Sequence, residues 1–128
     1  MNFITQPYRS MQCGQTCLAM ITGKNVDEIC EELGKHWSTS IDTDLMSYLN
    51  RSQYQTRLVK GSCITLEEIP NNSIIRLCYP SESGHFIVKT KGKYYDPSVG
   101  IIEEIKAHVK ITHYLTFEEK LKNKKTTQ

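Results

Sequence analysis

One cysteine stands at the start of a short apolar stretch, in the segment QCGQTCLAMITG at residues 12–23. The apolar spacing and the closing glycine predict a helix from Cys13 to Thr22 that ends at Gly23. The positive end of a helix dipole lowers the pKa of a thiol placed there and favours the thiolate. A thiolate is the nucleophile of covalent acyl-transfer chemistry, so Cys13 is the first candidate catalytic residue.

A thiol nucleophile needs a base beside it, and the base needs a third group that fixes its orientation. His85 begins a predicted strand, and Asp96 stands at the end of the returning strand, eleven residues later. A turn at residues 91–92 joins the two strands into a hairpin, which brings their outer ends together. Cys13, His85 and Asp96 are therefore predicted to be the nucleophile, the base and the orienting carboxylate.

The chain contains five cysteines, an odd number without the spacing of a secreted disulfide scaffold. Cys17 lies one helical turn after Cys13 and is predicted to be a buried, apolar thiol that faces the core. A zinc site made of Cys13, Cys17 and a histidine would use ligands on one helix face, but no second Cys/His pair with ligand spacing follows. We therefore expect no metal and no cofactor.

The helical half of the chain must hold the thiol in place. A second helix is predicted over Val26–Leu33, with Asn25 as its N-cap. Residues 39–40 would cap a third helix, predicted over Asp42–Asn50, whose buried residues are Leu45, Met46 and Leu49. Trp37, in the connector before it, is expected to close over the core, although it could instead wall a substrate cleft.

The second half of the chain changes to the period of β-strands. Apolar patterning predicts strands at residues 54–59, 73–79, 85–90, 93–95 and 111–117, with a helical turn at 65–68. Residues 97–110 fit either a helix or a strand, because their three isoleucines could line either one. Helices followed by antiparallel strands predict an α+β fold in two packed layers.

At 128 residues the chain is long enough for one domain with its own core, predicted over residues 1–117, followed by a polar, lysine-rich tail over 118–128. The net charge of +2 gives no reason to expect nucleic acid or an anionic membrane as a partner. No apolar run reaches the roughly 18–20 residues of a membrane span, and the N-terminus lacks the pattern of a signal peptide. We expect a cytoplasmic protein, and its oligomeric state stays open.

Three motifs resemble those of the bacteriocin-leader (double-glycine) peptidase family, which belongs to the papain-like cysteine proteases. The motifs are CGxxxLAM at residues 13–20, GHFIV at 84–88 and YDPSxG at 95–100. The resemblance covers about residues 6–100, most of the predicted domain. It implies a papain-like fold, with N-terminal helices packed on a C-terminal antiparallel sheet, and the catalytic order Cys13, His85, Asp96.

The family also uses a glutamine before the cysteine, whose side-chain amide joins the cysteine N–H in the oxyanion hole. Gln6 is the residue that corresponds to it, one position further from Cys13 than in the family pattern. Gln12 is the alternative, although its place next to the cysteine predicts that its side chain points elsewhere.

The best-known members of this family are N-terminal domains of export transporters that cut after a Gly-Gly leader. Without a predicted membrane part, this chain resembles the freestanding forms found in bacteria and their viruses, which act in processing or on host proteins. The first hypothesis is a cysteine protease that cleaves a peptide or isopeptide bond in a protein or peptide substrate. The alternatives are a transglutaminase or deamidase acting through the same three residues, and a non-catalytic binding module that keeps the fold.

Overall fold

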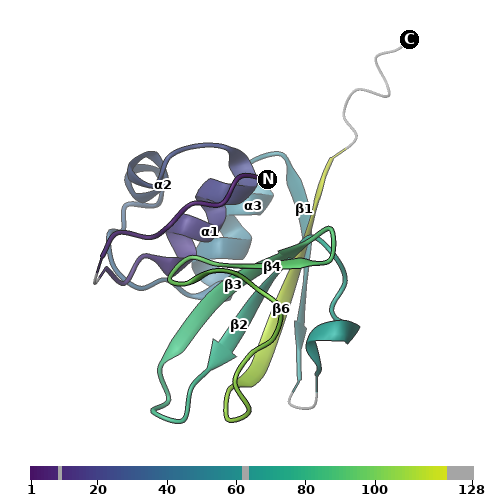
Figure 1. Ribbon diagram of the computed structural model, residues 1–128. Coiled ribbons are helices and arrows are strands. Elements are labelled where there is room, and N and C mark those ends of the chain that lie inside the picture. The colour runs from purple at the N-terminus through teal and green to yellow at the C-terminus, as the bar shows by residue number, and fades with distance from the viewer. Residues whose placement is uncertain (9, 62–63, 121–128) are drawn as a thin grey trace.

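The computed structural model describes residues 1–8, 10–61 and 64–120. Helices form the first part of these residues and a six-stranded antiparallel sheet forms the second part, which confirms the predicted α+β class. Figure 1 shows the helices gathered on one face of the sheet. In the described part of the chain, no helix is both long and apolar enough to cross a membrane.

Helices α1 (Cys13–Thr22) and α2 (Val26–Leu33) have the predicted bounds. Gly23 ends α1 in the left-handed conformation, with φ 82°, and its N–H donates to the Ala19 carbonyl at 2.9 Å. Asn25 and Glu28 form a capping box at the start of α2, because each side chain accepts a hydrogen bond from the other residue's N–H, at 2.8 and 3.1 Å. These two end signals fix the turn between the helices.

The third predicted helix, Asp42–Asn50, matches the helical segment to within one residue at each end, but its first part is not an α-helix. The chain instead forms a π-helical turn, η1 (Ile41–Met46), which runs into the short helix α3 (Ser47–Arg51). Ser40 caps this element, and its hydroxyl accepts a hydrogen bond from the Asp44 N–H at 3.2 Å. A π turn advances the chain by i→i+5 hydrogen bonds, which apolar spacing in a sequence does not distinguish from an α turn.

Two side chains in this region are more exposed than predicted. Met46 is only partly buried, whereas Leu45 and Leu49 are completely buried as expected. Trp37 exposes 55% of its surface, so the prediction that it closes over the core is wrong. Its backbone carbonyl accepts a hydrogen bond from the Gln15 side chain, which holds the connector against α1.

The sheet has the strand order β1-β6-β2-β3-β4-β5. The strands are β1 (Tyr54–Lys60), β2 (Ser73–Cys78), β3 (Gly84–Thr90), β4 (Lys93–Asp96), β5 (Gly100–Ile102) and β6 (Lys110–Glu119). All but β5 were predicted to within two residues at each end, and β5 lies in the stretch that the sequence left open. The predicted helical turn at 65–68 is the 3₁₀ turn η2 (Leu66–Glu68).

The turn between β3 and β4 sets the register of the hairpin. Lys91 and Gly92 both have positive φ, 50° and 75°, the combination that a two-residue hairpin turn of type I′ requires. This turn pairs Thr90 with Lys93 and Val88 with Tyr95. Every side chain further along the hairpin is placed by that register.

The end of β6 reaches into the predicted tail. Glu118 and Glu119 pair with Gln55 and Tyr54 of β1. Of the remaining tail, residues 121–128 lie outside the described part of the chain, so the boundary between domain and tail stays a prediction.

Alternation along the central strands divides the core into two clusters, one on each face of the sheet. Val88 of β3 belongs to the cluster on the helical face, together with Leu18 of α1. Ile87 belongs to the second cluster, together with Ile75 of β2 and Leu66 of η2. Figure 1 shows η2 on the side of the sheet away from the helices. Because α1 packs directly against β3, the first turn of α1 reaches the strand that carries His85.

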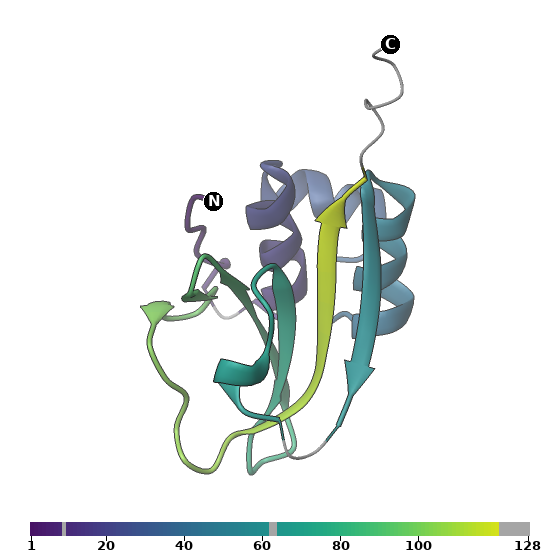
Figure 2. The same ribbon diagram turned by 90° about the vertical axis from the view of Figure 1, so that its right-hand side faces the viewer.

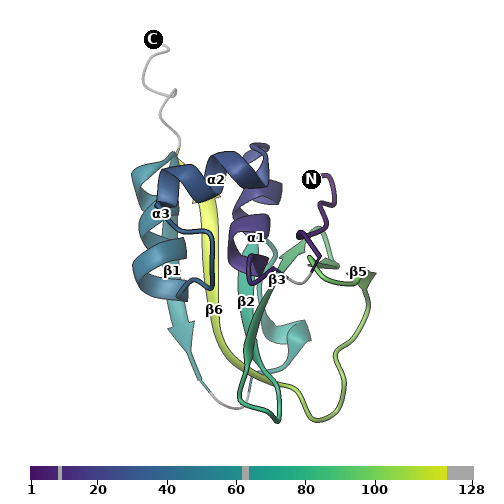
Figure 3. The same ribbon diagram turned by 90° about the vertical axis from the view of Figure 1, so that its left-hand side faces the viewer.

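The segment before α1 runs along the edge of the sheet at β5, as the views in Figures 2 and 3 show. Its backbone is fastened there, because the Gln6 N–H donates to the Pro97 carbonyl at 2.9 Å. Residues far apart in the sequence, at the N-terminus and just after β4, are therefore neighbours.

Replacing Asn25 by Ala removes the side-chain acceptor of the capping box and should lower the free energy of unfolding by about 1 kcal/mol. Urea denaturation followed by circular dichroism measures this change. Asn25→Asp keeps an acceptor oxygen and should remain within a few tenths of a kcal/mol of the wild type. Equal losses in both variants would contradict the capping role.

Candidate active site

Cys13 is the first residue of α1 and is partly exposed. Glutamine side chains on either side of it fasten this end of the helix to the connector after α2. Gln12 Nε2 donates to the His36 carbonyl at 2.9 Å, and Gln15 Nε2 donates to the Trp37 carbonyl at 2.7 Å. The thiol is therefore carried by a helix start that is held in place from outside the helix.

Gly14, which follows the thiol, permits a close approach of α1 to the third helical segment. A Cβ at Gly14 would overlap the Thr39 Oγ1 atom and lie 3.2 Å from the Leu45 side chain. Any larger residue would push the start of α1 away from this support. Packing alone therefore explains why a glycine follows Cys13, whatever the chemistry of the thiol.

His85 and Asp96 lie side by side at the outer end of the β3–β4 hairpin. His85 Nε2 and Asp96 Oδ1 are 2.7 Å apart, and the two side chains are nearly completely buried. Continuing the hairpin register places Asp96 opposite Ile87, so His85 projects from the same face one diagonal step away. The Ser98 N–H also donates to Asp96 Oδ1, at 2.8 Å, and holds the carboxylate from the following turn.

The His85 ring carries a strongly perturbed pKa. Burial lowers it, but hydrogen bonds to Asp96 and to the Cys13 side chain raise it more, and the net effect moves the pKa from 6.5 to about 9. Because the Cys13 side chain contributes to the raised pKa of His85, the thiol lies beside the same ring. The structure therefore brings together the three residues that the sequence singled out.

Gln6 lies close to this group, but its amide is bonded elsewhere. Its Nε2 donates to the Ser10 carbonyl at 2.9 Å, and its Oε1 accepts a hydrogen bond from the Ser98 hydroxyl at 3.0 Å. Gln12, the alternative, donates to His36 and points away, as predicted. The oxyanion role of Gln6 stays a prediction, and it requires the Nε2 group to leave Ser10.

Cys17 is completely buried one helical turn below Cys13, which confirms its predicted place in the core. Burial raises the pKa of its thiol well above the usual value, and the nearby Cys13 and Asp96 raise it further. A thiol in this environment stays protonated and unreactive. Among the described residues there is no group of three or more His, Cys, Asp or Glu side chains that could hold a metal ion.

Tyr79 belongs to the site, and the sequence reasoning missed it. Its ring centroid lies 6.1 Å from that of His85, with the rings inclined at 30°. Burial raises the pKa of the Tyr79 hydroxyl, and Asp96 and Cys13 add to the rise. A signal was present, because Tyr79 directly follows β2 and the antiparallel partner of β2 begins one residue before His85.

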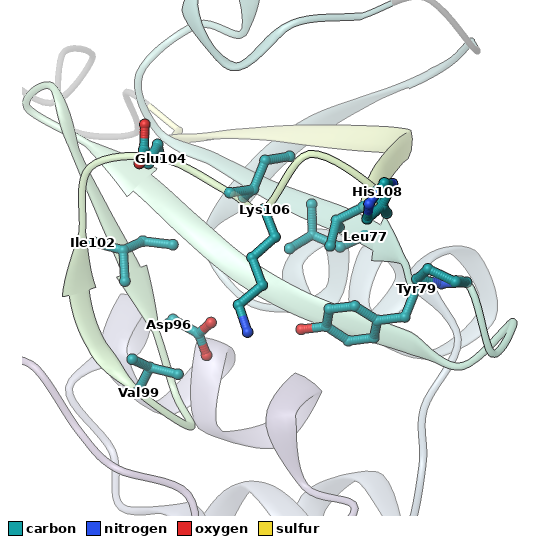
Figure 4. Close-up of a pocket in the computed structure, with 11 residues that line it drawn as sticks. Leu77, Tyr79, Asp96, Val99, Ile102, Glu104, Lys106 and His108 are labelled. Carbon is teal, nitrogen blue, oxygen red and sulfur yellow. The ribbon is translucent and has the colours of Figure 1, made fainter.

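A cavity of about 510 Å³ begins beside the Asp96 carboxylate (Figure 4). In that view the Tyr79 hydroxyl and the Lys106 ammonium point into the same space as the carboxylate, in front of α1. The rest of the lining consists of Glu104 and His108 and of six apolar residues from β2, β5 and the segments that follow β2, β4 and β5: Leu77, Pro80, Val99, Ile102, Ile105 and Val109. The catalytic candidates are thus continuous with an apolar hollow.

Comparison with known proteins gives a likeness in structure alone. No protein-family model and no curated protein sequence matches the chain. One similar solved structure is a double glycine motif protease from an AMS/PCAT transporter, in complex with the leader peptide. It superposes with a TM-score of 0.70 at 18% sequence identity, over 93% of this chain and 91% of that chain. The two proteins therefore share a fold over nearly their whole length.

The Asp96 carboxylate should hold the proton on His85 at neutral pH. In an NMR titration of the ring protons, His85 should stay protonated past pH 8, consistent with its pKa of about 9. In Asp96→Asn the ring should lose its proton at least about one pH unit lower, because a charged acceptor is replaced by a neutral one. His113 serves as the internal reference, since burial, Arg76 and Lys60 lower its pKa below 6.5. Identical His85 titrations in both proteins would contradict the pairing.

The same shift makes folding stability depend on pH. The folded-state pKa of His85 is raised above the value of 6.5, so its contribution to stability is complete below pH 6.5 and is lost as the pH rises through about 9. Urea unfolding of the wild type and of Asp96→Asn, measured between pH 6 and 9.5, should give a difference in stability that shrinks as the pH rises. A difference that is constant or grows with pH would contradict the assignment.

Proposed function

We propose that this protein is a cysteine peptidase with a papain-like arrangement, in which Cys13 is the nucleophile, His85 the general base and acid, and Asp96 the orienting residue. The observation that carries the proposal is the 2.7 Å hydrogen bond between His85 and Asp96, with the Cys13 side chain beside the same ring. A nucleophile, a base and an orienting group in contact are what acyl-transfer chemistry requires.

The reaction begins with the thiolate of Cys13 beside the imidazolium of His85. The sulfur attacks the carbonyl carbon of a peptide or isopeptide bond and forms a tetrahedral intermediate. Because the first N–H groups of a helix have no partners within it, the Cys13 N–H is available to the oxyanion. The Gln6 amide supplies the second donor once it turns from Ser10 toward the thiol.

His85 then gives its proton to the leaving amine, the C–N bond breaks, and the acyl group remains on Cys13 as a thioester. A water molecule, deprotonated by His85, attacks the thioester and restores the thiolate. Asp96 keeps the ring in one orientation through both steps and stabilises its positive charge. Both partners of this pair are nearly completely buried, which strengthens their interaction relative to one in water.

The substrate that this site fits best is a protein or peptide segment in an extended form. The solved structure with the similar fold is a peptidase holding a leader peptide, which supports a peptide substrate. We propose a processing or host-directed role in bacteria or phage, in the cytoplasm. Double-glycine specificity is a property of that similar protein, and it is not part of the proposal.

We expect Cys13 to be the reactive thiol because the neighbouring His85 favours its thiolate form. With iodoacetamide at pH 7, peptide mass spectrometry should find Cys13 modified before Cys78, the other partly exposed thiol described. His85→Ala should slow modification of Cys13 by about tenfold or more, because the imidazolium that favours the thiolate is gone. The rate at Cys78 serves as the matched control and should not change. An unreactive Cys13 would support the non-catalytic binding module instead.

Cys13→Ala should abolish turnover. Bacterial lysate treated with the wild type should acquire new protein N-termini that are absent after treatment with Cys13→Ala, as read by terminal proteomics. Equal sets of new termini from both proteins would exclude Cys13 as the nucleophile. Modified but uncleaved proteins, with a mass gain of about one dalton for deamidation or an added amine, would assign the same residues to acyl transfer.

A further inference from the structure

Two residues that line the cavity beyond Asp96, namely Asp96 itself and Tyr79, also lie next to His85. Asp96 is bonded to one nitrogen of His85, and the Tyr79 ring lies against the His85 ring. Asp96 lines the cavity whereas Cys13 and His85 do not, so the cavity lies on the carboxylate side of the His85–Asp96 pair. The cavity is therefore separated from Cys13 by little more than the His85 ring and its hydrogen bond to Asp96.

In a bound substrate, the half that leaves after cleavage extends from the thiol toward His85. The leaving amine must lie at the His85 nitrogen to receive its proton, so the chain that follows this amine starts there. An extended peptide advances about 3.3 Å per residue, and alternate side chains point to the same side. A side chain two or three residues after the scissile bond can therefore enter the hollow.

The lining of the cavity defines the chemistry of its occupant. Leu77, Ile102 and Val109 present apolar side chains, and Val99 at the rim is 74% exposed although it is apolar. Glu104 and His108 also line the cavity. The volume of about 510 Å³ falls within the range of small-ligand sites and accommodates one large side chain with its backbone. Figure 4 shows the Lys106 ammonium at the polar end, beside Asp96 and the Tyr79 hydroxyl, where it can donate to a peptide carbonyl.

We propose that this cavity is a specificity subsite for a large apolar side chain, at the second or third residue after the scissile bond of the substrate. The inference rests on the proposed peptidase function and adds the substrate class on the leaving side. Apolar pockets of this kind discriminate between side chains by about 10- to 200-fold.

Acyl transfer to added peptides tests the subsite without the natural substrate. N-acetylglycine p-nitrophenyl ester acylates Cys13: the thiolate forms a thioester, p-nitrophenolate leaves, and the His85 imidazolium releases its proton to the solvent. The free amine of an added peptide then attacks the thioester in competition with water, its proton passes to His85, an amide bond forms, and the thiolate is restored. The ratio of amide to acid product measures how well the peptide occupies the leaving side.

Three acceptor peptides share the same attacking glycine amine: glycylglycinamide, glycyl-leucinamide and glycyl-glycyl-leucinamide. With the wild type, at least one leucine peptide should give about tenfold or more amide product than glycylglycinamide at equal concentration. Equal products from all three peptides, with acylation of Cys13 intact, would overturn the subsite while leaving the peptidase proposal in place. A p-nitrophenolate burst that does not depend on Cys13 would overturn the proposed function and the subsite with it.

Variants in and next to β5 test whether the leucine preference depends on the cavity or on its surroundings. Ile102→Asp places a carboxylate in the apolar lining and should reduce the leucine preference to about twofold or less. Ile101→Asp is the matched control, because Ile101 is the exposed neighbour on β5 and does not line the cavity; it should keep the full preference. Val99→Asp changes an exposed rim residue that the fold does not need, and it should also weaken the preference. Full preference in both Val99→Asp and a folded Ile102→Asp would exclude the cavity.

Discussion

The register of the β3–β4 hairpin is the constraint on which the candidate site depends. Its turn, Lys91-Gly92, adopts positive φ at both residues, and this geometry aligns the strands so that His85 and Asp96 project from one face. A slip by one residue would turn the side chains of one strand to the opposite face and separate the pair. Burying His85 and Asp96 without each other as partners would then cost free energy. The hydrogen-bonded pair and the hairpin register therefore stabilise each other.

The helical layer contributes the third group, and its position is set by packing rather than by the hairpin. The Gln12 and Gln15 side chains bind the connector after α2, and Gly14 allows the helix start to sit against Thr39. With Cys17 buried one turn below, the two thiols of the same helix have opposite environments. The position of Cys13 therefore depends on contacts between three separate parts of the chain.

The likeness to a solved double glycine motif protease shows how far the fold persists when sequences diverge, since 18% identity accompanies a TM-score of 0.70. A fold of this kind tolerates substitution because apolar patterning, caps and turns specify it more than individual residues do. Tyr79 and the cavity beyond Asp96 border the candidate site.

Local signals in the sequence determined the elements that carry the three candidate residues. The glycine after Thr22, the capping box at Asn25 and the Lys91-Gly92 turn each act within a few residues, so pattern reasoning could place α1, α2 and the hairpin. The same reasoning put Asp96 within reach of His85, because a hairpin joins them directly. It also separated the buried Cys17 from Cys13, since only Cys13 stands at the start of the helix.

The features that depend on contacts between distant segments could be determined only from the tertiary structure. The π turn η1, the exposure of Trp37 and the bonding of Gln6 to Ser98 all depend on how distant segments pack together. Tyr79 and the cavity beyond Asp96 arise where β2, β4, β5 and the connection to β6 converge. Local propensity carries no information about such convergence, because the free energy that selects it comes from burial between elements rather than within them.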